Sequence, residues 1–341
     1  MIGDVLTTSI LFEALKQKFP DSELHYIVNS NTIPVIENNP FIDKFIEISP
    51  EIEKSKWRFF KFLRSIRKTP YDAVIDVYGK FSSSLISWIV KSPVKIGYYK
   101  KYTRFIFDHP TKRINKPIHN SSLAIENRLR LLEPLGVSFT KLSPKIYLTP
   151  EETKEAMSFL KDANIDLAKP IFMISVLGSS PEKTYPFDYM AQLLDMIVEE
   201  KQAQILFNYI PSQKDEALAI YNQCQEHTKG HIFIDVYGKS LRSFLGITSH
   251  CDALLGNEGG ANNMAKALGL PTFTIFSPYL SKHNWFGEVE NNEHVAIHLS
   301  DYIDYSPHDK ESAKKDPETY YIKLKPEFIE PALKSFLDEL N

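Results

Sequence analysis

Short apolar runs alternate with amphipathic stretches along almost the whole chain. The apolar runs are typical of buried strands, and apolar residues at three- and four-residue spacing are typical of helices. The predicted strands span residues 24–28, 44–48, 73–77, 95–99, 171–177, 204–210, 231–236, 253–256 and 272–276. The predicted helices span residues 5–18, 32–38, 55–68, 80–90, 121–135, 186–200, 212–227, 240–249, 261–268 and 326–340. This alternation predicts an α/β protein with two doubly wound, Rossmann-like parallel sheets that face a cleft.

The start of the chain does not follow this alternation. A βαβ fold opens with a buried strand, but here Met1 leads through Ile-Gly-Asp directly into a predicted helix. We therefore expect the first strand, about ten residues, to lie upstream of Met1. The joint between the domains is expected near residues 141–170, which contain Pro144, Pro150 and Pro170.

Composition and charge limit the classes of protein and of binding partner that fit this chain. The 341 residues are 43% hydrophobic and 24% charged, which fits two globular domains, and two cysteines are too few for a disulfide framework. Residues 1–150 carry 23 Lys+Arg and 14 Asp+Glu, whereas residues 151–341 carry 17 and 29. The two halves are therefore expected to meet different partners. Nucleic acid is a poor candidate, because the second half is acidic and no nucleic-acid motif is present.

Three segments carry candidate chemistry, and the first is Ile2–Thr8 at a helix start. Gly3 allows close backbone approach. Asp4 stands where free amides and the helix dipole favour a carboxylate. Asp4 is therefore either a simple helix cap or a functional acid.

The second segment, residues 178–186, follows a predicted strand, and ligands of open α/β sheets bind beyond the carboxyl ends of strands. Its small residues Gly178, Ser179 and Ser180, together with Lys183, suit a phosphate group, although an ordinary polar loop is an equal alternative.

The third segment runs from a strand through a glycine-rich turn into a helix over residues 256–271. Gly259 and Gly260 expose amides at the helix N-terminus, which is a ready anion site. Glu258 lies inside this turn, where a carboxylate is costly unless it meets a hydroxyl or a cation.

Taken together and in this order, the three segments resemble glycosyltransferase family 9, the heptosyltransferases of lipopolysaccharide core assembly. The resemblance includes Gly3-Asp4-Val5, residues 20–24 and 71–76, Gly178-Ser179-Ser180 with Lys183, and the turn at residues 258–263. In that turn Glu258 stands for the family's Asp, Gly259 for its hydroxyl residue and Asn263 for its His.

The resemblance implies a GT-B-like fold and a set of site residues. An acceptor-binding domain would span 1–150 and a nucleotide-sugar domain 151–324, and a helix over 325–341 would return to the N-terminal domain. Asp4 would act as the base and Lys183 would stabilise the leaving diphosphate. The implied donor-binding residues are Gly178, Ser179, Ser180, Gln213, Glu258, Gly259, Gly260 and Asn263.

The basic, aromatic stretch at 54–68 has two interpretations. It could contact an anionic glycolipid acceptor and the inner face of the cytoplasmic membrane, or it could be a solvated helix whose aromatic residues face the core. The candidate acceptor-binding residues are Lys54, Lys56, Arg58, Lys61 and Arg64.

The resemblance implies an inverting glycosyltransferase that uses an ADP-heptose-type donor, and with the basic stretch at 54–68 we expect a cytoplasmic, peripheral membrane enzyme. No Asp-x-Asp pair is present to hold a metal against a nucleotide diphosphate, so we expect no metal and no cofactor. Two alternatives stay open: a nucleotide-sugar epimerase or hydrolase on the same scaffold, and a carbohydrate-binding protein without catalysis.

Overall fold

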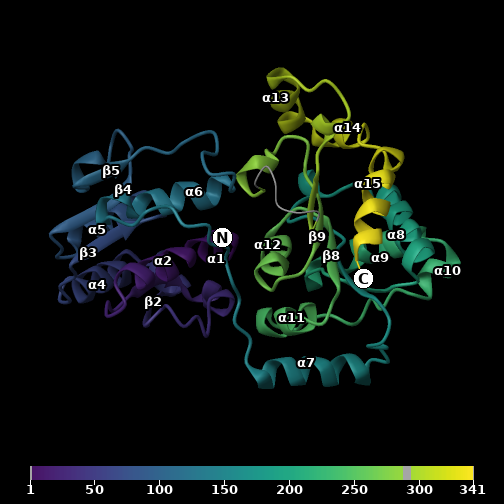
Figure 1. Ribbon diagram of the computed structural model, residues 1–341, viewed down its shortest axis with the longest axis horizontal. Coiled ribbons are helices and arrows are strands. Elements are labelled where there is room, and N and C mark those ends of the chain that lie inside the picture. Colours follow the sequence, from purple (N-terminus) through teal and green to yellow (C-terminus); the bar gives the residue numbers. More distant parts are fainter. Residues whose placement is uncertain (1, 287–292, 341) are drawn as a thin grey trace. The chain divides into compact units, whose positions relative to one another are not determined.

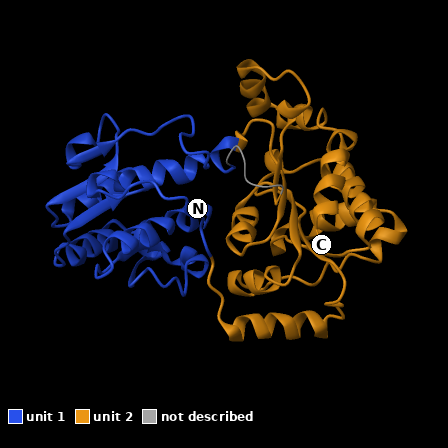
Figure 2. Cartoon of the chain, viewed as in Figure 1, with its two compact units in different colours: residues 1–145, 283–289 blue, residues 146–282, 290–341 orange. Residues whose placement is uncertain are grey.

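The computed structural model describes residues 2–286 and 293–340. Its contacts divide the chain into two compact units, residues 1–145 with 283–289 and residues 146–282 with 290–341 (Figure 2). Both units are built from parallel strands and helices, so the predicted α/β class with parallel sheets is confirmed.

The second unit contains a five-stranded sheet in the order β10-β9-β8-β6-β7, and all of its neighbours are parallel. After the first strand, β6, the chain adds β7 on one side and then crosses over to add β8, β9 and β10 on the other. The strand order therefore reverses between β6 and β8. The strands are β6 (Ile171–Ser175), β7 (Gln204–Phe207), β8 (Ala253–Asn257), β9 (Thr272–Ile275) and β10 (His294–Ile297).

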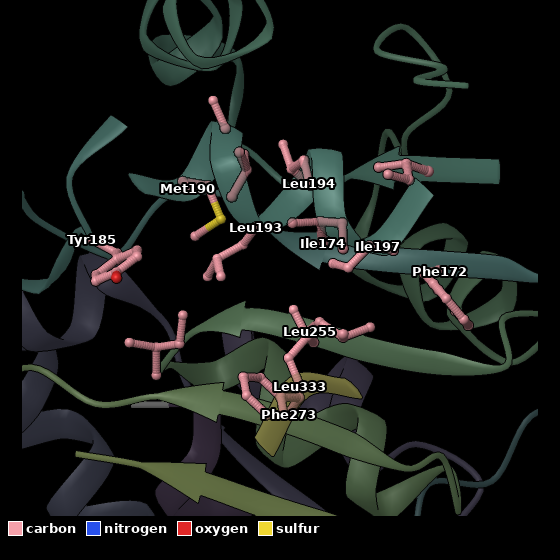
Figure 3. Close-up of a cluster of buried hydrophobic side chains, with 14 of the residues drawn as sticks. Phe172, Ile174, Tyr185, Met190, Leu193, Leu194, Ile197, Leu255, Phe273 and Leu333 are labelled. Carbon is pink, nitrogen blue, oxygen red and sulfur yellow. The ribbon is translucent and has the colours of Figure 1, made fainter. Parts of the chain in front are cut away.

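Helices cover both faces of this sheet. α8, α9 and α15 lie on one side and α11 and α12 on the other (Figure 1). Every residue of β6 and β8 is buried, as expected for central strands of a parallel sheet. Phe172, Leu255 and Phe273 of the sheet pack in one cluster with Leu193 and Leu333 of the helices (Figure 3). The helices of this unit are α7 (Pro150–Asp162), α8 (Phe187–Lys201), α9 (Lys214–Gln223), α10 (Glu226–Lys229), α11 (Leu241–Thr248), α12 (Gly260–Ala267), α13 (Pro307–Lys315), α14 (Pro317–Tyr321) and α15 (Pro326–Glu339).

The C-terminal helix α15 contributes to the core of the second unit. Ile329, Leu333 and Phe336 of α15 belong to the core of the second unit, where α15 lies against α8. The return of this helix to the N-terminal domain stays a prediction. The apolar residues of α15 are covered by the sheet and by α8 of the second unit.

The first unit has its strands in two separate sheets. β1 (His25–Asn29) pairs in parallel with β2 (Lys44–Ile48). β3 (Ala73–Asp76), β4 (Val94–Tyr98) and β5 (His109–Thr111) form the second sheet, also parallel. The helices of this unit are α1 (Ile2–Thr8), α2 (Ile10–Lys18), α3 (Pro50–Lys54), α4 (Lys56–Ile66), α5 (Phe81–Ile89) and α6 (Leu123–Leu129).

Two predicted elements differ in form. The single helix expected at 5–18 is interrupted at Ser9, where the hydroxyls of Thr7, Thr8 and Ser9 donate to carbonyls three or four residues back. Such local hydrogen bonds compete with a regular helix. The strand expected at 231–236 is reduced to an isolated bridge between Ile232 and Ile205, because the chain turns at Phe233, whose carbonyl accepts from Val236.

Candidate active site

The candidate donor site lies at the point where the strand order of the second unit reverses. In open α/β sheets ligands bind beyond the carboxyl ends of the two strands at such a point. Here these strands are β6 and β8. Residues 178–186 follow β6 and residues 258–260 follow β8, so the second and third motifs predicted from the sequence meet at the reversal.

Asn257, the last residue of β8, connects the two segments. Its buried side-chain amide donates to the carbonyl oxygens of Ser175 and Val176, at 3.0 and 2.9 Å. Its side-chain oxygen accepts from the backbone N–H of Tyr185 at 2.7 Å. One side chain therefore fixes both ends of the loop after β6. No role is predicted for Asn257 from the sequence, although a polar residue directly after an apolar strand is a signal that could have identified it.

Lys183 and Glu258 form an ion pair across the two segments. The Nζ atom of Lys183 lies 3.3 Å from Oε1 of Glu258. Glu258 is only 8% exposed, so this pair supplies the cation that a carboxylate in the turn requires. Lys183 ends the short 3-10 turn η4 (Pro181–Lys183) and keeps part of its side chain accessible.

Gly178 and Gln213 belong to the same local structure. A Cβ atom on Gly178 would overlap the carbonyl group of Lys183, so only glycine allows the loop to fold back this closely. The side-chain amide of Gln213 donates to the carbonyl oxygen of Gly178 at 3.0 Å. Gln213 thus supports the backbone of the loop after β6.

The turn at Gly259 and Gly260 is open. Cβ atoms added to either glycine would meet no atom within 4 Å, so close packing of the protein does not explain these two glycines. They stand at the start of α12, whose first amides point outward from a helix N-terminus. Asn262 is buried and donates to the carbonyl oxygen of Asn257, while Asn263 is half-buried.

The two serines of the loop differ in their surroundings. Ser179 is exposed, and Ser180 is half-buried. The carboxyl of Glu182 has its pKa lowered by its own backbone amide and by a hydrogen bond from the Ser180 hydroxyl. Ser179 is therefore the more accessible hydroxyl for a ligand.

In the first unit, Asp4 lies in α1 beside Arg128 of α6. The Arg128 guanidinium contacts Oδ1 of Asp4 at 2.8 Å and also donates to the Thr8 hydroxyl and to the carbonyl of Ala124. Arg128 is buried and Asp4 is half-buried. Asp4 is thus held by a cation 124 positions away, and a helix cap does not explain that contact. Arg128 was missed because nothing in the sequence links these two positions.

The helix α4 has one apolar, buried face and one basic, exposed face. It therefore has both the core-facing aromatic residues and the accessible cations that the two interpretations of residues 54–68 require. Leu63 and Ile66 are buried, and Phe59 and Phe62 pack against the same apolar cluster. Trp57 and Phe60 are 65% and 54% exposed, and their rings stack at 6.1 Å. The five candidate acceptor-binding residues are all exposed: Lys54, Lys56, Arg58, Lys61 and Arg64.

Over residues 2–286 and 293–340, no three His, Cys, Asp or Glu side chains gather as a metal ion would require. Within the same ranges, none of the helices combines the length and apolar character needed to cross a bilayer.

Known proteins resemble this chain over most of its length. The chain is 25% identical over 303 residues to lipopolysaccharide heptosyltransferase 1 of Campylobacter coli, with 84% of each chain covered. It is 20% identical over 330 residues to an Escherichia coli lipopolysaccharide heptosyltransferase 3, covering 95% of this chain and 93% of the relative.

Solved structures share the fold. A glycosyl transferase family 9 structure from Veillonella parvula matches with a TM-score of 0.84 at 20% identity, covering 99% of this chain and 95% of that one. The E. coli ADP-heptose lipopolysaccharide heptosyltransferase II matches with a TM-score of 0.71 at 15% identity, covering 99% and 96%. The fold is therefore GT-B-like, as the resemblance implied. The model of glycosyltransferase family 9 (heptosyltransferase) matches residues 59–314, and the chain belongs to this family of enzymes.

Proposed function

We propose that this glycosyltransferase moves a heptose from an ADP-heptose-type donor onto a lipopolysaccharide core or a related glycolipid, with inversion at the anomeric carbon and without a metal ion. The observation that carries the donor side is the meeting of Lys183, Glu258 and the N-terminus of α12 at the strand reversal. The sugar and the acceptor are taken from the names of the relatives, which are lipopolysaccharide heptosyltransferases.

The donor would bind through its diphosphate. The Lys183 ammonium and the free amides at the start of α12 are positive groups that suit phosphate oxygens. Ser179 would add a hydroxyl, and Asn257 and Gln213 would keep the loop in shape. As the sugar–phosphate bond breaks, negative charge grows on the departing diphosphate, and the same groups would stabilise it. Glu258 would orient Lys183 and accept from a donor hydroxyl.

The acceptor would be activated by Asp4. A carboxylate there can take the proton of the attacking hydroxyl as the new bond to the anomeric carbon forms and the bond to the diphosphate breaks. The contact with Arg128 would fix the direction of the carboxylate, because the guanidinium is itself held by Thr8 and Ala124. A single displacement of this kind inverts the anomeric centre.

The acceptor surface would be the exposed side of α4. Four of the candidate cations, Lys56, Arg58, Lys61 and Arg64, share this helix with the two exposed rings Trp57 and Phe60, and Lys54 ends the preceding helix α3. Such a combination suits the boundary of an anionic bilayer, where aromatic rings enter the headgroup region and cations meet phosphates. The enzyme would therefore work on the cytoplasmic side, at the inner face of the cytoplasmic membrane.

The test is a transfer assay with ADP-heptose and a lipopolysaccharide core that lacks heptose. We expect a product heavier by one heptose, of opposite anomeric configuration to the donor, and an unchanged rate in EDTA. Activity that is lost in EDTA and restored by magnesium would contradict the metal-independent mechanism. Transfer from another nucleotide sugar but not from ADP-heptose would contradict the proposed donor.

A further inference from the structure

Helix α5 turns its large apolar side chains outward and its serines inward. Phe81 and Trp88 are seven residues apart, which places them on one side of the helix, and they are 73% and 60% exposed. Ser84 and Ser87 are buried on the other side. A helix on the surface of a globular protein normally has the opposite arrangement, with its polar residues outside. An exposed apolar surface of this kind marks a contact with another molecule or with a membrane.

The serines of α5 face inward because they hold the end of β3. The hydroxyls of Ser83 and Ser84 each donate to Oδ2 of Asp76 at 3.1 Å, and the hydroxyl of Ser87 donates to the carbonyl of Ser83. Asp76 also accepts from the backbone N–H of Gly79 at 2.8 Å. These hydrogen bonds fix the rotation of α5 about its own axis, so the first unit itself directs the apolar side of the helix outward.

A third exposed ring lies near α5. The short 3-10 turn η2 (Arg104–Ile106) contacts α5, and its Phe105 is 78% exposed. Leu85, one turn after Phe81 on the same side of α5, is half-buried. None of the nine residues of α5 is charged. Phe81, Leu85, Trp88 and Phe105 together make up the α5 surface.

Cations flank the α5 surface. Lys80 directly precedes α5, and the Nζ atom of Lys95 donates to the carbonyl of Trp88 at 2.9 Å, so a positive charge lies at each end of the helix. Residues 78–118 contain nine Lys and Arg but a single acidic residue, Asp108. Because like charges repel, this excess disfavours a second copy of the same surface as the partner and favours an anionic one.

We propose that the α5 surface enters the interfacial region of an anionic phospholipid bilayer. Phe81, Trp88 and Phe105 bury their rings at the boundary with the acyl chains, while Lys80 and Lys95 meet lipid phosphates. The proposal deepens the proposed transfer to a glycolipid and rests on it, because a lipid-linked acceptor lies in the same bilayer. It adds an uncharged helix face to the basic helix α4 as a second contact with the membrane.

Trp88 itself can report the insertion. The chain has three tryptophans, so in Trp57→Phe/Trp285→Phe only Trp88 remains. When phosphatidylglycerol vesicles are added, we expect the fluorescence emission of Trp88 to shift to shorter wavelength and to be quenched by lipids that are brominated in their acyl chains. An emission maximum that stays the same while the protein sediments with the vesicles would overturn the proposal.

A second measurement removes the two rings of the helix. Phe81→Ser/Trp88→Ser should weaken sedimentation with phosphatidylglycerol vesicles by at least about tenfold, because less apolar area leaves water. The matched control Phe159→Ser/Ile322→Ser removes two exposed apolar side chains of the second unit and should bind as the wild type does. Circular dichroism checks that each variant is folded. Vesicle binding of Phe81→Ser/Trp88→Ser at the level of the wild type would contradict the proposal.

Transfer assays separate this proposal from the proposed function. With a heptose-free core saccharide released from its lipid, Phe81→Ser/Trp88→Ser should keep the rate of the wild type. With the lipid-linked acceptor in phosphatidylglycerol vesicles it should be slower by at least about tenfold. If the wild type transferred to neither acceptor, the proposed function would fail, and the vesicle experiments would still decide on the α5 surface. Concentration-dependent dimerisation that shields Trp88 without lipid would assign this surface to a second copy and overturn the bilayer contact.

Discussion

The guanidinium of Arg128 holds the carboxylate of Asp4 at 2.8 Å, and the two residues are 124 positions apart in the chain. Arg128 also donates to the hydroxyl of Thr8, one helical turn after Asp4, so it contacts the same helix twice. A surface ion pair contributes little, but Arg128 is buried and its guanidinium also donates to the carbonyl of Ala124. The arrangement fixes the direction of one carboxylate, which is what a proposed general base requires.

Asp4→Asn should lower kcat for heptose transfer by roughly 100- to 10,000-fold, because the amide cannot accept the proton of the acceptor hydroxyl. Donor affinity should be almost unchanged, since the proposed donor site lies in the other unit. Steady-state kinetics and calorimetric titration with the donor measure the two effects separately. Asp21→Asn, at an exposed position, is the matched control and should keep the activity of the wild type. Wild-type turnover in Asp4→Asn would require another base.

Lys183→Ala should weaken donor binding and also lower kcat. The ammonium would meet the diphosphate both before the reaction and in the transition state, so its loss affects both parameters. We expect a combined loss in kcat/KM of about 100-fold or more, as for other groups that stabilise developing charge. Lys169→Ala removes an exposed lysine of the same unit and should have no effect. If Lys183→Ala left the donor Kd unchanged, Lys183 would not contact the diphosphate in the ground state.

The sequence alone places the candidate donor segments together, but it does not identify the residues that support them. Motifs such as residues 178–186 and 258–263 are local, and the rule that parallel strands end at one edge brings them together. Asn257 and Arg128 act through contacts with distant segments, which no spacing in the sequence reveals. Pro150 lies in the stretch where the joint between the domains is expected, and with the Thr149–Glu152 capping box it begins α7.

Two features of the fold could not be predicted from the sequence for a similar reason. An amphipathic helix such as α15 has an apolar stripe in its sequence, but the stripe does not identify the surface that will cover it. The apolar run at 231–236 fits a strand as well as a turn, and only the packing beside β7 decides between them.

Asn257→Ala should destabilise the protein and loosen the donor loop. The carbonyls of Ser175 and Val176 and the amide of Tyr185 would lose a buried partner, which we expect to cost about 3 kcal/mol of unfolding free energy. Urea denaturation followed by circular dichroism measures this loss. Asn222→Ala, on the exposed side of α9, should change stability by less than about 0.5 kcal/mol. A stability loss with unchanged donor affinity would show that the loop does not need this clamp for binding.

Reversing charge on α4 should reduce membrane binding without affecting chemistry on a soluble acceptor. In Lys56→Glu/Lys61→Glu two exposed cations become anions, so attraction to an anionic bilayer falls. Each lysine near such a surface contributes about 1 kcal/mol, so we expect binding to anionic vesicles to weaken at least tenfold. Sedimentation with phosphatidylglycerol vesicles measures this. Lys154→Glu/Lys169→Glu changes the net charge equally in the second unit and serves as the control. Equal losses in both variants would point to net charge instead of the α4 surface.

The stability of the second unit should fall in mild acid because of His294. Burial, aided by the charge of Lys266, lowers the pKa of His294 from 6.5 to about 4. Because the folded pKa lies below the unfolded one, the unfolded chain binds the proton more tightly, and stability decreases as pH falls from about 6.5 towards 4. The full effect is up to about 3 kcal/mol, and it is absent above pH 7, where His294 is neutral in both states.

Urea denaturation of the wild type and of His294→Asn between pH 7.5 and 4 measures this contribution. Asn keeps a polar partner for the hydroxyl of Thr272, which lies 3.2 Å from Nδ1 of His294, but it cannot be protonated in this range. The variant should therefore lose less stability than the wild type between pH 6.5 and 4, even if it is less stable at neutral pH. His298 also has its pKa lowered by burial, so part of the acid sensitivity should persist in the variant. His308→Asn, at an exposed position, should retain the pH dependence of the wild type. Parallel stability curves for the wild type and His294→Asn would mean that His294 is not kept neutral by the fold.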